Sequence, residues 1–264
     1  MLELKNVKKT FNRGSINEKK ALSGVNLKLA PGDFVTVIGG NGAGKSTMLN
    51  MIAGVYPIDS GAVIIDGKNV TRQPDYKRAA YLGRVFQDPM MGTAADMEIE
   101  ENLAMAFRRG KRRGLGWGIL KQEKKIYYEA LQMLELGLEE RMSSKVGLLS
   151  GGQRQALTLL MATLQQPKVL LLDEHTAALD PKTAAKVLKL TQELVEKNHL
   201  TTLMITHNMK DAIRLGNRLV MMHEGNIIYD VKGAEKKQLK VPDLLAKFEE
   251  ASNGEFANDR MMLS

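Results

Sequence analysis

The run Gly39-Gly-Asn-Gly-Ala-Gly44-Lys45-Ser46 constrains this chain more than any other feature of its sequence. It fits the pattern G-x-x-x-x-G-K-[ST], and its surroundings are the ones in which that pattern has meaning. Before it, Phe34–Ile38 is a nearly continuous β-rich run, as expected of a strand buried on both faces. After it, Ser46–Ala53 has helical spacing and is closed by Gly54. A strand, a glycine-rich turn and a helix in this order predict a loop that binds phosphate groups.

The residue types in this loop suit a nucleoside triphosphate. Glycines let the backbone curl so that successive N–H groups point at phosphate oxygens, and the helix N-terminus adds partial positive charge. Lys45 is expected to reach the β- and γ-phosphates, Ser46 to ligate Mg²⁺, and Thr47 to donate to the α-phosphate. The predicted binding set is Gly39, Asn41, Gly42, Ala43, Gly44, Lys45, Ser46 and Thr47.

A second apolar run, Val169–Leu172, ends in the two acids Asp173 and Glu174. In open α/β folds a buried strand delivers such residues to the edge of the sheet where ligands bind. Asp173 is predicted to hold Mg²⁺ through water, and Glu174 to polarise the attacking water. Asp173 could instead cap a loop, but its occurrence in one chain with a phosphate loop favours the metal role.

Composition narrows the partners. The 264 residues are 44% hydrophobic and 26% charged, which is typical of a globular chain, and they contain no Cys, which excludes disulfides, thiolate metal sites and a Cys nucleophile. The net charge of +8 favours anionic partners without choosing among them. The start of the chain does not resemble a signal peptide, and no apolar stretch approaches the ~18 residues of a membrane span. We therefore expect a soluble chain that acts at a membrane only through another chain.

Strand and helix signals alternate along the chain and predict a mainly parallel sheet. Strands are expected at Val169–Leu172, Thr201–Ile205 and Leu219–Met222, with a helix over Pro181–Lys197. Helical spacing dominates from about 88 to 165, notably in Ile99–Phe107, Ile126–Leu136 and Ala156–Leu164, and predicts an inserted helical lobe. We predict one domain over 1–232, with a core of 1–86 and 166–232 and a helical subdomain of 87–165. A helical extension, 233–264, would follow, with a polar tail that frays from Ser252.

The segment Leu149-Ser150-Gly151-Gly152-Gln153 opens a further helix with a hydroxyl, two glycines and exposed N–H groups. With the phosphate loop and the Asp-Glu strand, it resembles the signature of the ABC-type ATPase family over roughly residues 2 to 230. The resemblance implies an α/β P-loop NTPase fold, with a RecA-like mainly parallel sheet, an antiparallel β arm and an inserted α-helical subdomain. It also implies ATP and Mg²⁺ as ligands, and a head-to-tail dimer in which Ser150, Gly151, Gly152 and Gln153 read the nucleotide of the other copy.

The resemblance assigns further residues one by one. Gln87 matches the Q-loop glutamine, which contacts Mg²⁺ or water, and Asp180 matches the D-loop residue that reaches across the dimer. His207 matches the switch histidine that senses the γ-phosphate; alone, it would read as a satisfied histidine at a strand end. Phe11 lies where the family keeps an aromatic to stack on adenine, or it is a core residue of an N-terminal strand.

Two positions depart from the family's usual Asp-Glu-Pro-Thr-Ser-Ala-Leu-Asp. His175 replaces the proline, which releases a backbone constraint, and Ala177 replaces the serine hydroxyl. The Asp-Glu-His-Thr variant resembles an importer subgroup whose members travel with a membrane permease and a substrate-binding lipoprotein. The substrates suggested for that subgroup are amino acids, including aromatic ones, or other small organic solutes.

Eight cations and one acid lie in residues 108–125, a stretch that is either a solvated loop between helices or a surface near anionic headgroups.

Three hypotheses for the function follow from the motifs. The first is an ATPase subunit that drives transport, most simply import, through a separate permease at the cytoplasmic face of the membrane. The second is a nucleic-acid- or ribosome-associated ATPase of the same superfamily, and the third is a non-hydrolysing nucleotide sensor. The single cassette argues against the second, and the intact Glu174 and His207 argue against the third. Nucleic acid is therefore not expected as a partner.

Overall fold

The computed structural model describes residues 1–111 and 118–251 and divides the chain into two compact units. Unit 1 contains residues 1–78 and the chain from His199 onward, and unit 2 contains Ala79–Asn198. The predicted boundaries between a core of 1–86 and 166–232 and a helical subdomain of 87–165 stay a prediction. The fraying predicted from Ser252 falls outside the described residues.

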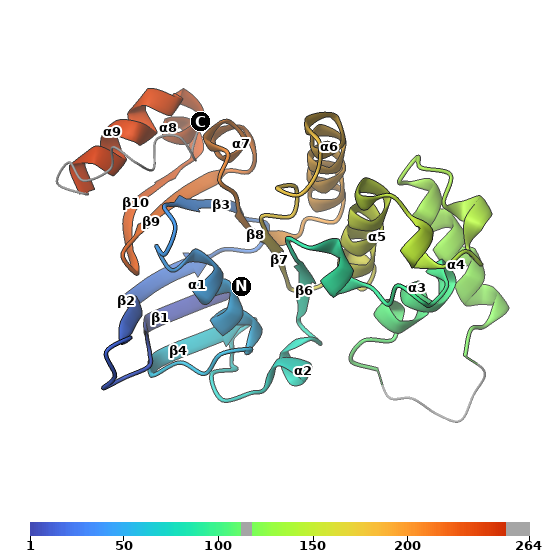
Figure 1. Cartoon of the computed structure of the whole chain (residues 1–264), viewed down its shortest axis with the longest axis horizontal. Helices are drawn as coiled ribbons and strands as arrows, with labels where there is room; N and C mark the ends of the chain where they lie inside the picture. Colours follow the sequence, from blue (N-terminus) through green and yellow to red (C-terminus); the bar gives the residue numbers. More distant parts are fainter. Residues whose placement is uncertain (112–117, 252–264) are drawn as a thin grey trace. The chain divides into compact units, whose positions relative to one another are not determined.

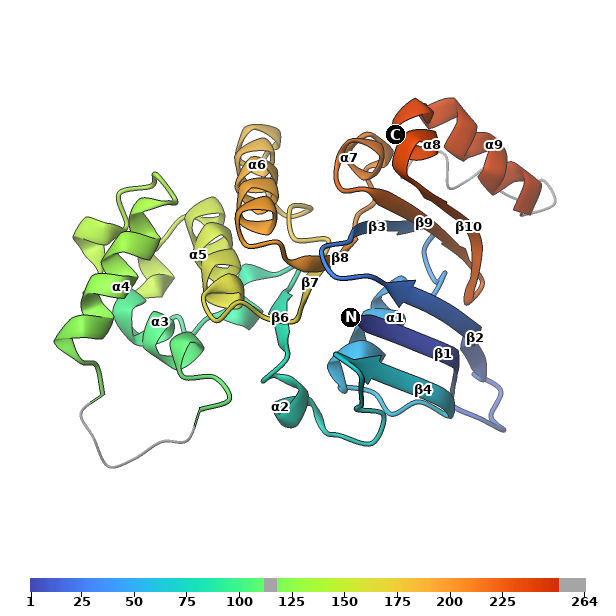
Figure 2. The ribbon, with the colours of Figure 1, turned by 180° about the vertical axis from the view of Figure 1, so that it is seen from behind.

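Unit 1 contains an antiparallel sheet with the strand order β2-β1-β4-β5, seen in Figures 1 and 2. Its strands are β1 (Leu2–Phe11), β2 (Lys19–Leu29), β4 (Ser60–Ile65) and β5 (Lys68–Asn69). Leu4 pairs with Leu27 on one side and with Val63 on the other, and all three are buried. Alternation of buried and exposed residues along β2 turns its apolar face inward. This sheet is the antiparallel arm that the sequence predicts.

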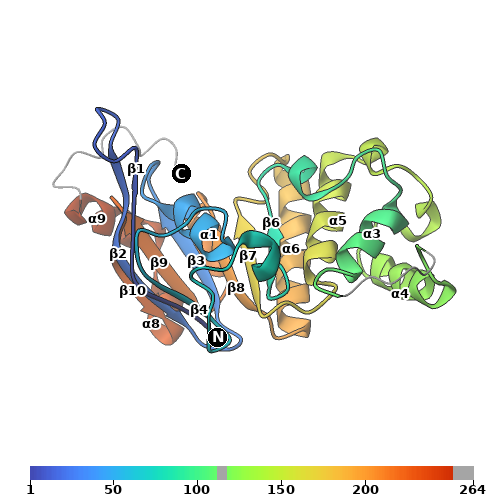
Figure 3. The same ribbon diagram turned by 90° about the horizontal axis from the view of Figure 1, so that it is seen from below.

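The second group of strands in unit 1 has the order β10-β9-β3-β8. Its members are β3 (Phe34–Gly39), β8 (Thr201–Ile205), β9 (Arg218–His223) and β10 (Asn226–Lys232). β3 is parallel to both β8 and β9, and every residue of β3 is buried, as expected of a central strand. Helix α1 (Lys45–Ala53) follows β3 and contacts both β2 and β3. It therefore lies between the two sheets of this unit (Figure 3).

The end of α1 is fastened by a buried arginine from α2 (Asp75–Arg78). The Arg78 guanidinium donates to the carbonyl oxygens of Met51 at 2.6 Å and Ile52 at 3.0 Å in the last turn of α1. It also donates to the carbonyls of Thr71 and Gln73, both at 2.9 Å. The last carbonyls of a helix have no partner within it, and the positive charge suits that end of the helix. Arg78 thus holds the helix that carries Lys45 and Ser46.

The C-terminal helices of the described chain pack on unit 1 near α7 (Met209–Arg214), as Figure 1 shows. They are α8 (Gly233–Gln238) and α9 (Val241–Ala251). Leu244 and Phe248 of α9 are buried in a cluster with Met209 and Leu219. Lys236 is buried and donates to the carbonyls of Leu215 and, at 3.1 Å, Gly216, beyond the end of α7; burial lowers its pKa to about 8. Both helices lie within 233–264, where the sequence predicts a helical extension, and the bounds of that extension stay a prediction.

Unit 2 combines two parallel strands, β6 (Leu82–Val85) and β7 (Val169–Asp173), with α-helices. The helices are α3 (Ile99–Phe107), α4 (Lys121–Gln132), α5 (Gly151–Thr163) and α6 (Pro181–Lys197), with short 3₁₀ turns at Pro89–Gly92, Glu139–Arg141 and Val146–Leu148. Side chains from α3, α4 and α5, including Leu103, Tyr127 and Leu157, form one buried apolar cluster. This cluster is the core of the helical lobe that the sequence predicts.

Helix α4 begins and ends earlier than the apolar spacing of Ile126–Leu136 predicts. Its first turn is polar, and it is closed by the Glu123 carboxylate, which accepts from the Leu120 N–H at 2.9 Å and pairs with Arg108 at 2.6 Å. After Gln132 the backbone turns away, with Glu135 at φ 52° and Gly137 at φ 66°. Apolar residues 134 and 136 therefore pack against the cluster from the turn that follows the helix.

Substituting Arg78 tests its role. Arg78→Met removes the side-chain donor of four buried or half-buried carbonyls, of which that of Met51 keeps the Gly54 N–H at 3.2 Å, so we expect the free energy of unfolding to fall by about 2–3 kcal/mol. Lys77→Met, at an exposed neighbouring position, should change it by less than about 0.5 kcal/mol. Urea unfolding followed by circular dichroism measures both. Equal midpoints for the two variants would contradict this role for Arg78.

Candidate functional site

The phosphate loop of unit 1 follows the last residue of β3 and enters α1 at Lys45. Gly44 occupies the position before the helix with φ 98°, and a β-carbon there would lie 2.4 Å from the Ala21 carbonyl oxygen. Only glycine fits both the backbone conformation and the space. The loop is joined to the β9–β10 turn by a hydrogen bond from the Gly225 N–H to the Ala43 carbonyl, 3.0 Å long. Neighbouring strands thus fix the curl that the sequence predicts.

Lys45 is 5% exposed, and its ammonium group lies against its own loop. Nζ donates to the carbonyl oxygens of Gly39 at 2.7 Å and Gly40 at 3.0 Å. Ser46 is exposed and Thr47 is half-buried, both in the first turn of α1. A pocket of about 510 Å³ adjoins the loop, lined by Lys19, Lys20, Ser23, Gly40, Asn41, Gly42, Ala43, His223, Glu224 and Asn226. Lys19 and Lys20 therefore line the pocket beside the loop that holds Lys45, and their positive charge suits an anionic ligand.

His207 lies at the same end of the parallel strands as the loop. Val37 of β3 pairs with Ile205 of β8. Gly39 lies two residues after Val37, and His207 lies two residues after Ile205. The Thr206 N–H donates to the Val37 carbonyl at 3.1 Å and extends the pairing past the end of β8. Carboxyl ends of parallel strands form the ligand edge of such sheets.

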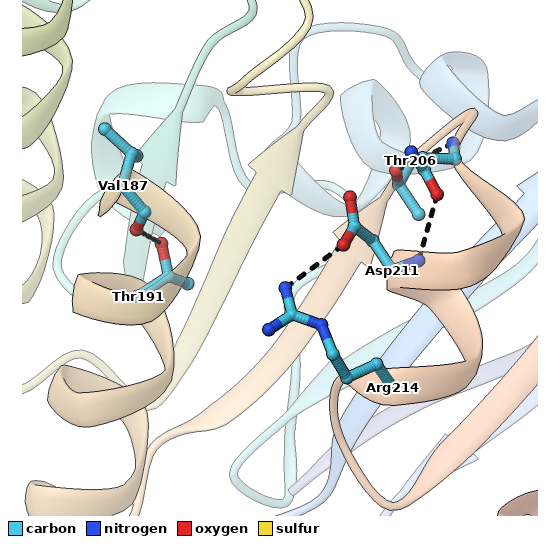
Figure 4. Close-up of polar contacts among 6 residues, drawn as sticks. Val187, Thr191, Thr206, Asp211 and Arg214 are labelled. Atoms are coloured by element: carbon cyan, nitrogen blue, oxygen red, sulfur yellow. Dashed lines mark hydrogen bonds and ion pairs between the residues drawn. The ribbon is translucent and has the colours of Figure 1, made fainter. Parts of the chain in front are cut away.

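The segment after His207 is tightly structured (Figure 4). The Asn208 N–H donates to the Thr206 hydroxyl at 3.1 Å, and the Asn208 side chain caps α7 by accepting from the Asp211 N–H at 3.0 Å. Arg214 then pairs with Asp211 at 3.1 Å. His207 is thus followed at once by a capped helix, which limits how far its backbone can shift.

Phe11 lies at the end of β1 and is half-buried. Its ring meets the Tyr56 ring edge to face, with centroids 5.4 Å apart and planes at 83°, and Lys9 Nζ lies 5.4 Å from its centroid. Phe11 does not line the pocket beside the phosphate loop. Stacking of Phe11 on adenine stays a prediction.

In unit 2, Gln87, Asp173 and Glu174 come together at the ends of two parallel strands. Val85 of β6 pairs with Leu172 of β7, which brings Gln87 level with Glu174 just beyond the strands. The Asp173 carboxylate is half-buried, with Oδ2 3.9 Å from Arg84 Nη2. Glu174 has a backbone φ of 47°, in the left-handed region. The carboxylates and the amide predicted to serve the chemistry therefore share one edge in this unit.

Ser150 and Gln153 form a capping box at the start of α5. The Ser150 hydroxyl accepts from the Gln153 N–H at 3.3 Å, and the Gln153 side chain accepts from the Ser150 N–H at 3.1 Å. Ser150 and Gly151 are exposed, so the serine–glycine tip faces solvent. The spacing Ser-x-x-Gln is a sequence signature of such a box, which our reading of the sequence missed.

Helix α5, which begins in the signature segment, packs closely against α6, and the two helices lie side by side in Figures 2 and 3. A β-carbon on Gly152 would lie 2.2 Å from Thr183 Cγ2, and one on Gly151 would lie 3.6 Å from Leu179 Cδ2. Asp180 caps α6, accepting from the Thr183 N–H at 3.1 Å, and these hydrogen bonds lower the pKa of its carboxyl. The residues assigned to the signature and to the D-loop thus lie side by side in unit 2.

Two polar side chains that support this region, one buried and one half-buried, escaped the sequence analysis. Gln155 of α5 is fully buried, and its Nε2 donates to the Phe86 carbonyl at 3.2 Å, one residue before Gln87. Arg154 donates to the carbonyls of Gly147 at 3.0 Å and Leu149 at 3.2 Å, just before the signature. Neither residue type marks a motif, since the partners are backbone carbonyls, which any residue type can supply.

His175 follows Glu174 and is 1% exposed. Its Nε2 lies 3.0 Å from the Thr191 hydroxyl in α6, and burial lowers its pKa to about 4. The ring is therefore neutral at physiological pH. His175, which stands where the family usually has proline, is thus a buried hydrogen-bonding group.

The described cations of residues 108–125 are largely engaged inside unit 2. Arg108 pairs with Glu123 at 2.6 Å and Lys124 with Glu100 at 2.8 Å, while Lys111 lies 4.0 Å from the centroid of the Phe107 ring. Arg109 donates to the Ala162 carbonyl at 3.3 Å, and burial lowers its pKa. Residues 112–117 lie outside the described residues. The headgroup interpretation of this stretch stays a prediction.

Comparison with known proteins agrees with this geometry. Residues 22–177 match the family model described as ABC transporter. The Tyrosine transport ATP-binding protein of Clostridioides difficile (strain R20291) is 43% identical over 251 residues, which cover 95% of this chain and 100% of that protein. The Spermidine/putrescine import ATP-binding protein PotA of Haemophilus influenzae (strain 86-028NP) is 34% identical over 87% of this chain, but the chain spans only 57% of PotA.

Solved structures give the same result. The ATP-binding cassette MJ0796, described as a dimer in a post-hydrolysis state bound to ADP and Pi, superposes with a TM-score of 0.75 at 33% identity, over 88% of this chain and 98% of that one. The chain belongs to the ABC transporter ATP-binding family. Its predicted fold and its function as an ATP-hydrolysing, ATP-binding subunit of an ABC transporter are confirmed. Within residues 1–111 and 118–251, no helix has the length and apolar character needed to cross a membrane.

The buried His175 makes a prediction about acid stability. Its pKa is about 4 when folded and 6.5 as an ordinary histidine, so the unfolded chain binds more protons between these values, and stability falls as the pH drops below 6.5. Between pH 7.5 and pH 5 this group should cost the folded state about 2 kcal/mol. His175→Gln should lose that much less stability over the same interval, as measured by urea unfolding at both pH values. An equal loss in the two proteins would refute the burial of a neutral ring.

Proposed function

We propose that this chain binds Mg²⁺-ATP in the phosphate loop and hydrolyses it in a head-to-tail dimer that drives import through a separate membrane permease. The observation that carries the proposal is common to both units. In each, the residues assigned to nucleotide chemistry follow the carboxyl ends of paired parallel strands, with Lys45 and His207 in one and Gln87 and Glu174 in the other. Convergence of this kind is typical of the ligand edge of open α/β sheets.

Each side chain has a definite part in this proposal. Backbone N–H groups of Gly39–Gly44, with Lys45, cradle the phosphates, Thr47 donates to the α-phosphate, and Phe11 stacks on the base. Glu174 orients and polarises the attacking water, Gln87 contacts that water, and His207 donates to the γ-phosphate. Positioning and charge stabilisation supply most of the rate enhancement in phosphoryl transfer, so these groups need no covalent step.

The donor set also suits a magnesium ion. Ser46, Gln87 and Asp173 offer a hydroxyl, an amide oxygen and a carboxylate, which are the oxygen ligands that Mg²⁺ prefers. The Asp173 carboxylate is half-buried, and its Oδ2 lies 3.9 Å from Arg84 Nη2. When bound, the ion neutralises charge on the phosphate oxygens.

The presence of two segments suited to phosphate binding in one chain supports a dimer. The solvent-facing Ser150-Gly151-Gly152 tip is a second helix start suited to phosphate, whereas the chain has one phosphate loop. The related cassette MJ0796 is described as dimeric with ADP and Pi. We infer that the tip, with Gln153 and Asp180 behind it, completes the site of a second copy.

The identity of the transported solute is proposed from the relatives' names. One relative, matched over 95% of this chain and 100% of its own length, is a Tyrosine transport ATP-binding protein, whereas others are named for spermidine/putrescine, choline or phosphonates. We propose an amino acid, with tyrosine as the first solute to test, delivered by a substrate-binding protein to the permease at the outer face. The cassette itself works at the cytoplasmic face.

Replacing the water activator tests hydrolysis and the dimer together. Glu174→Gln should bind ATP with wild-type affinity but hydrolyse it about a hundredfold or more slowly, because only the group that polarises water is lost. The same variant should run as a dimer in size exclusion with Mg²⁺-ATP. Adding Ser150→Arg should return it to a monomer while ATP binding persists. Retained turnover in Glu174→Gln would exclude Glu174 as activator, and a persistent dimer in the double variant would exclude the shared site.

The transport role predicts a partner. The tagged chain, extracted from membranes of its own cell in mild detergent, should co-purify with a multi-span permease. In proteoliposomes, a tyrosine-loaded binding protein should raise the ATPase rate severalfold over the empty one, since substrate loading must reach the cassette through the permease. Lys45→Ala complexes, which lose the main counter-charge for the triphosphate, should show no stimulated rate. Stimulation by RNA in place of a permease would instead favour the nucleic-acid-associated alternative.

A further inference from the structure

The residue assigned to water activation has an unfavourable backbone conformation. Glu174 follows β7 with φ 47°, where a side chain with a β-carbon is rarely found. Such a conformation persists only where the surrounding structure fixes the chain on both sides. On the N-terminal side, the buried pairing of β7 with β6 supplies that restraint. On the C-terminal side, the backbone after Glu174 needs a restraint of its own.

His175 supplies a contact on that side. It is 1% exposed, whereas the other residues from Glu174 to Asp180 are half-buried or exposed. Hydrogen bonds from the Ala177 N–H to the Glu174 carbonyl, 2.9 Å, and from the Leu179 N–H to the Thr176 carbonyl, 3.2 Å, join the segment to itself. The His175 ring instead joins it to Thr191, near the middle of α6.

The direction of that hydrogen bond follows from proton counting. The Thr191 hydroxyl donates its one proton to the Val187 carbonyl at 2.8 Å (Figure 4), so its oxygen must accept from His175. The ring therefore carries its proton on Nε2, 3.0 Å from the Thr191 oxygen. Nδ1 has no hydrogen-bond partner within the described residues, which agrees with an unprotonated nitrogen there.

We propose that His175 is a positioning residue for ATP hydrolysis: its Nε2–H···Oγ1 bond to Thr191 fixes the backbone immediately after Glu174. The usual family sequence has proline at this position, whose ring restrains φ directly. Histidine lacks that restraint, and the bond to α6 replaces it. This inference rests on the proposed role of Glu174. It assigns His175 no contact with nucleotide or water.

A matched pair of threonine variants isolates the bond. Thr191→Val keeps the shape of the side chain but removes the acceptor, so we expect kcat for ATP to fall about tenfold, with KM for ATP within twofold of wild type. Thr191→Ser keeps the acceptor and should restore kcat. The control is Thr163→Val, because Thr163 is also buried in a helix and its hydroxyl donates to the Leu159 carbonyl at 3.0 Å. It should leave kcat within twofold.

The double variant His175→Leu/Thr191→Val separates positioning from folding. Removing both partners leaves no unpaired buried donor, so thermal melting should recover relative to Thr191→Val alone. The rate should not recover, because the restraint is still absent, and kcat should equal that of His175→Leu. All variants are assayed as full chains beside Glu174→Gln.

A folded Thr191→Val with wild-type kcat, or a double variant whose kcat recovers together with its melting temperature, would overturn the inference. A low kcat shared by Thr163→Val would do the same. If Glu174→Gln itself turned over normally, the proposed function would fail first, and the two failures are therefore distinguishable.

Discussion

Hydrogen bonding between parallel strands is the interaction on which the chemistry of this protein depends. The pairing of Val37 with Ile205 puts the phosphate loop and His207 at one sheet edge, and the pairing of Val85 with Leu172 does the same for Gln87 and Glu174. The strands β3, β7 and β8 are buried on both faces, and a shift of one residue in either register would exchange the side chains on those two faces. The register therefore positions polar groups that have little packing of their own.

Helix starts are the second constraint, and each start near the site is prepared in a different way. α1 begins after a left-handed glycine, α5 after a serine in a capping box, and α6 after Asp180 with a proline in its first turn. Gly44 frees N–H groups for a ligand, whereas Ser150 and Gln153 already satisfy each other. A phosphate reaching the signature would therefore compete with the Ser150–Gln153 box, and the two glycines between them remain the readily available donors.

Much of this could be predicted from the sequence, because the motifs combine local signals. Helices over Ile99–Phe107 and Pro181–Lys197 lie where apolar spacing and capping residues predict them. Helix α4 does not, because its first turn is stabilised by the Glu123–Arg108 pair, which no periodicity reveals. The supporting roles of Gln155, Arg154 and Arg78 were out of reach for the same reason: each donates to backbone carbonyls, and any residue type can present a carbonyl once the fold brings it near.

The departure at His175 shows how a local rule can be broken and compensated in the same structure. A proline after Glu174 would restrain the chain by covalent geometry, at no cost in buried polar atoms. A histidine must be buried, kept neutral and given a partner, and Thr191 serves as that partner only because its own proton is committed to Val187. The restraint therefore depends on two residues, His175 and Thr191, which are sixteen positions apart on either side of the D-loop, rather than on a single proline. The pair joins the residue after Glu174 to α6, and Asp180 caps the first turn of that helix, so the backbone after Glu174 is held to a helix rather than by a ring of its own.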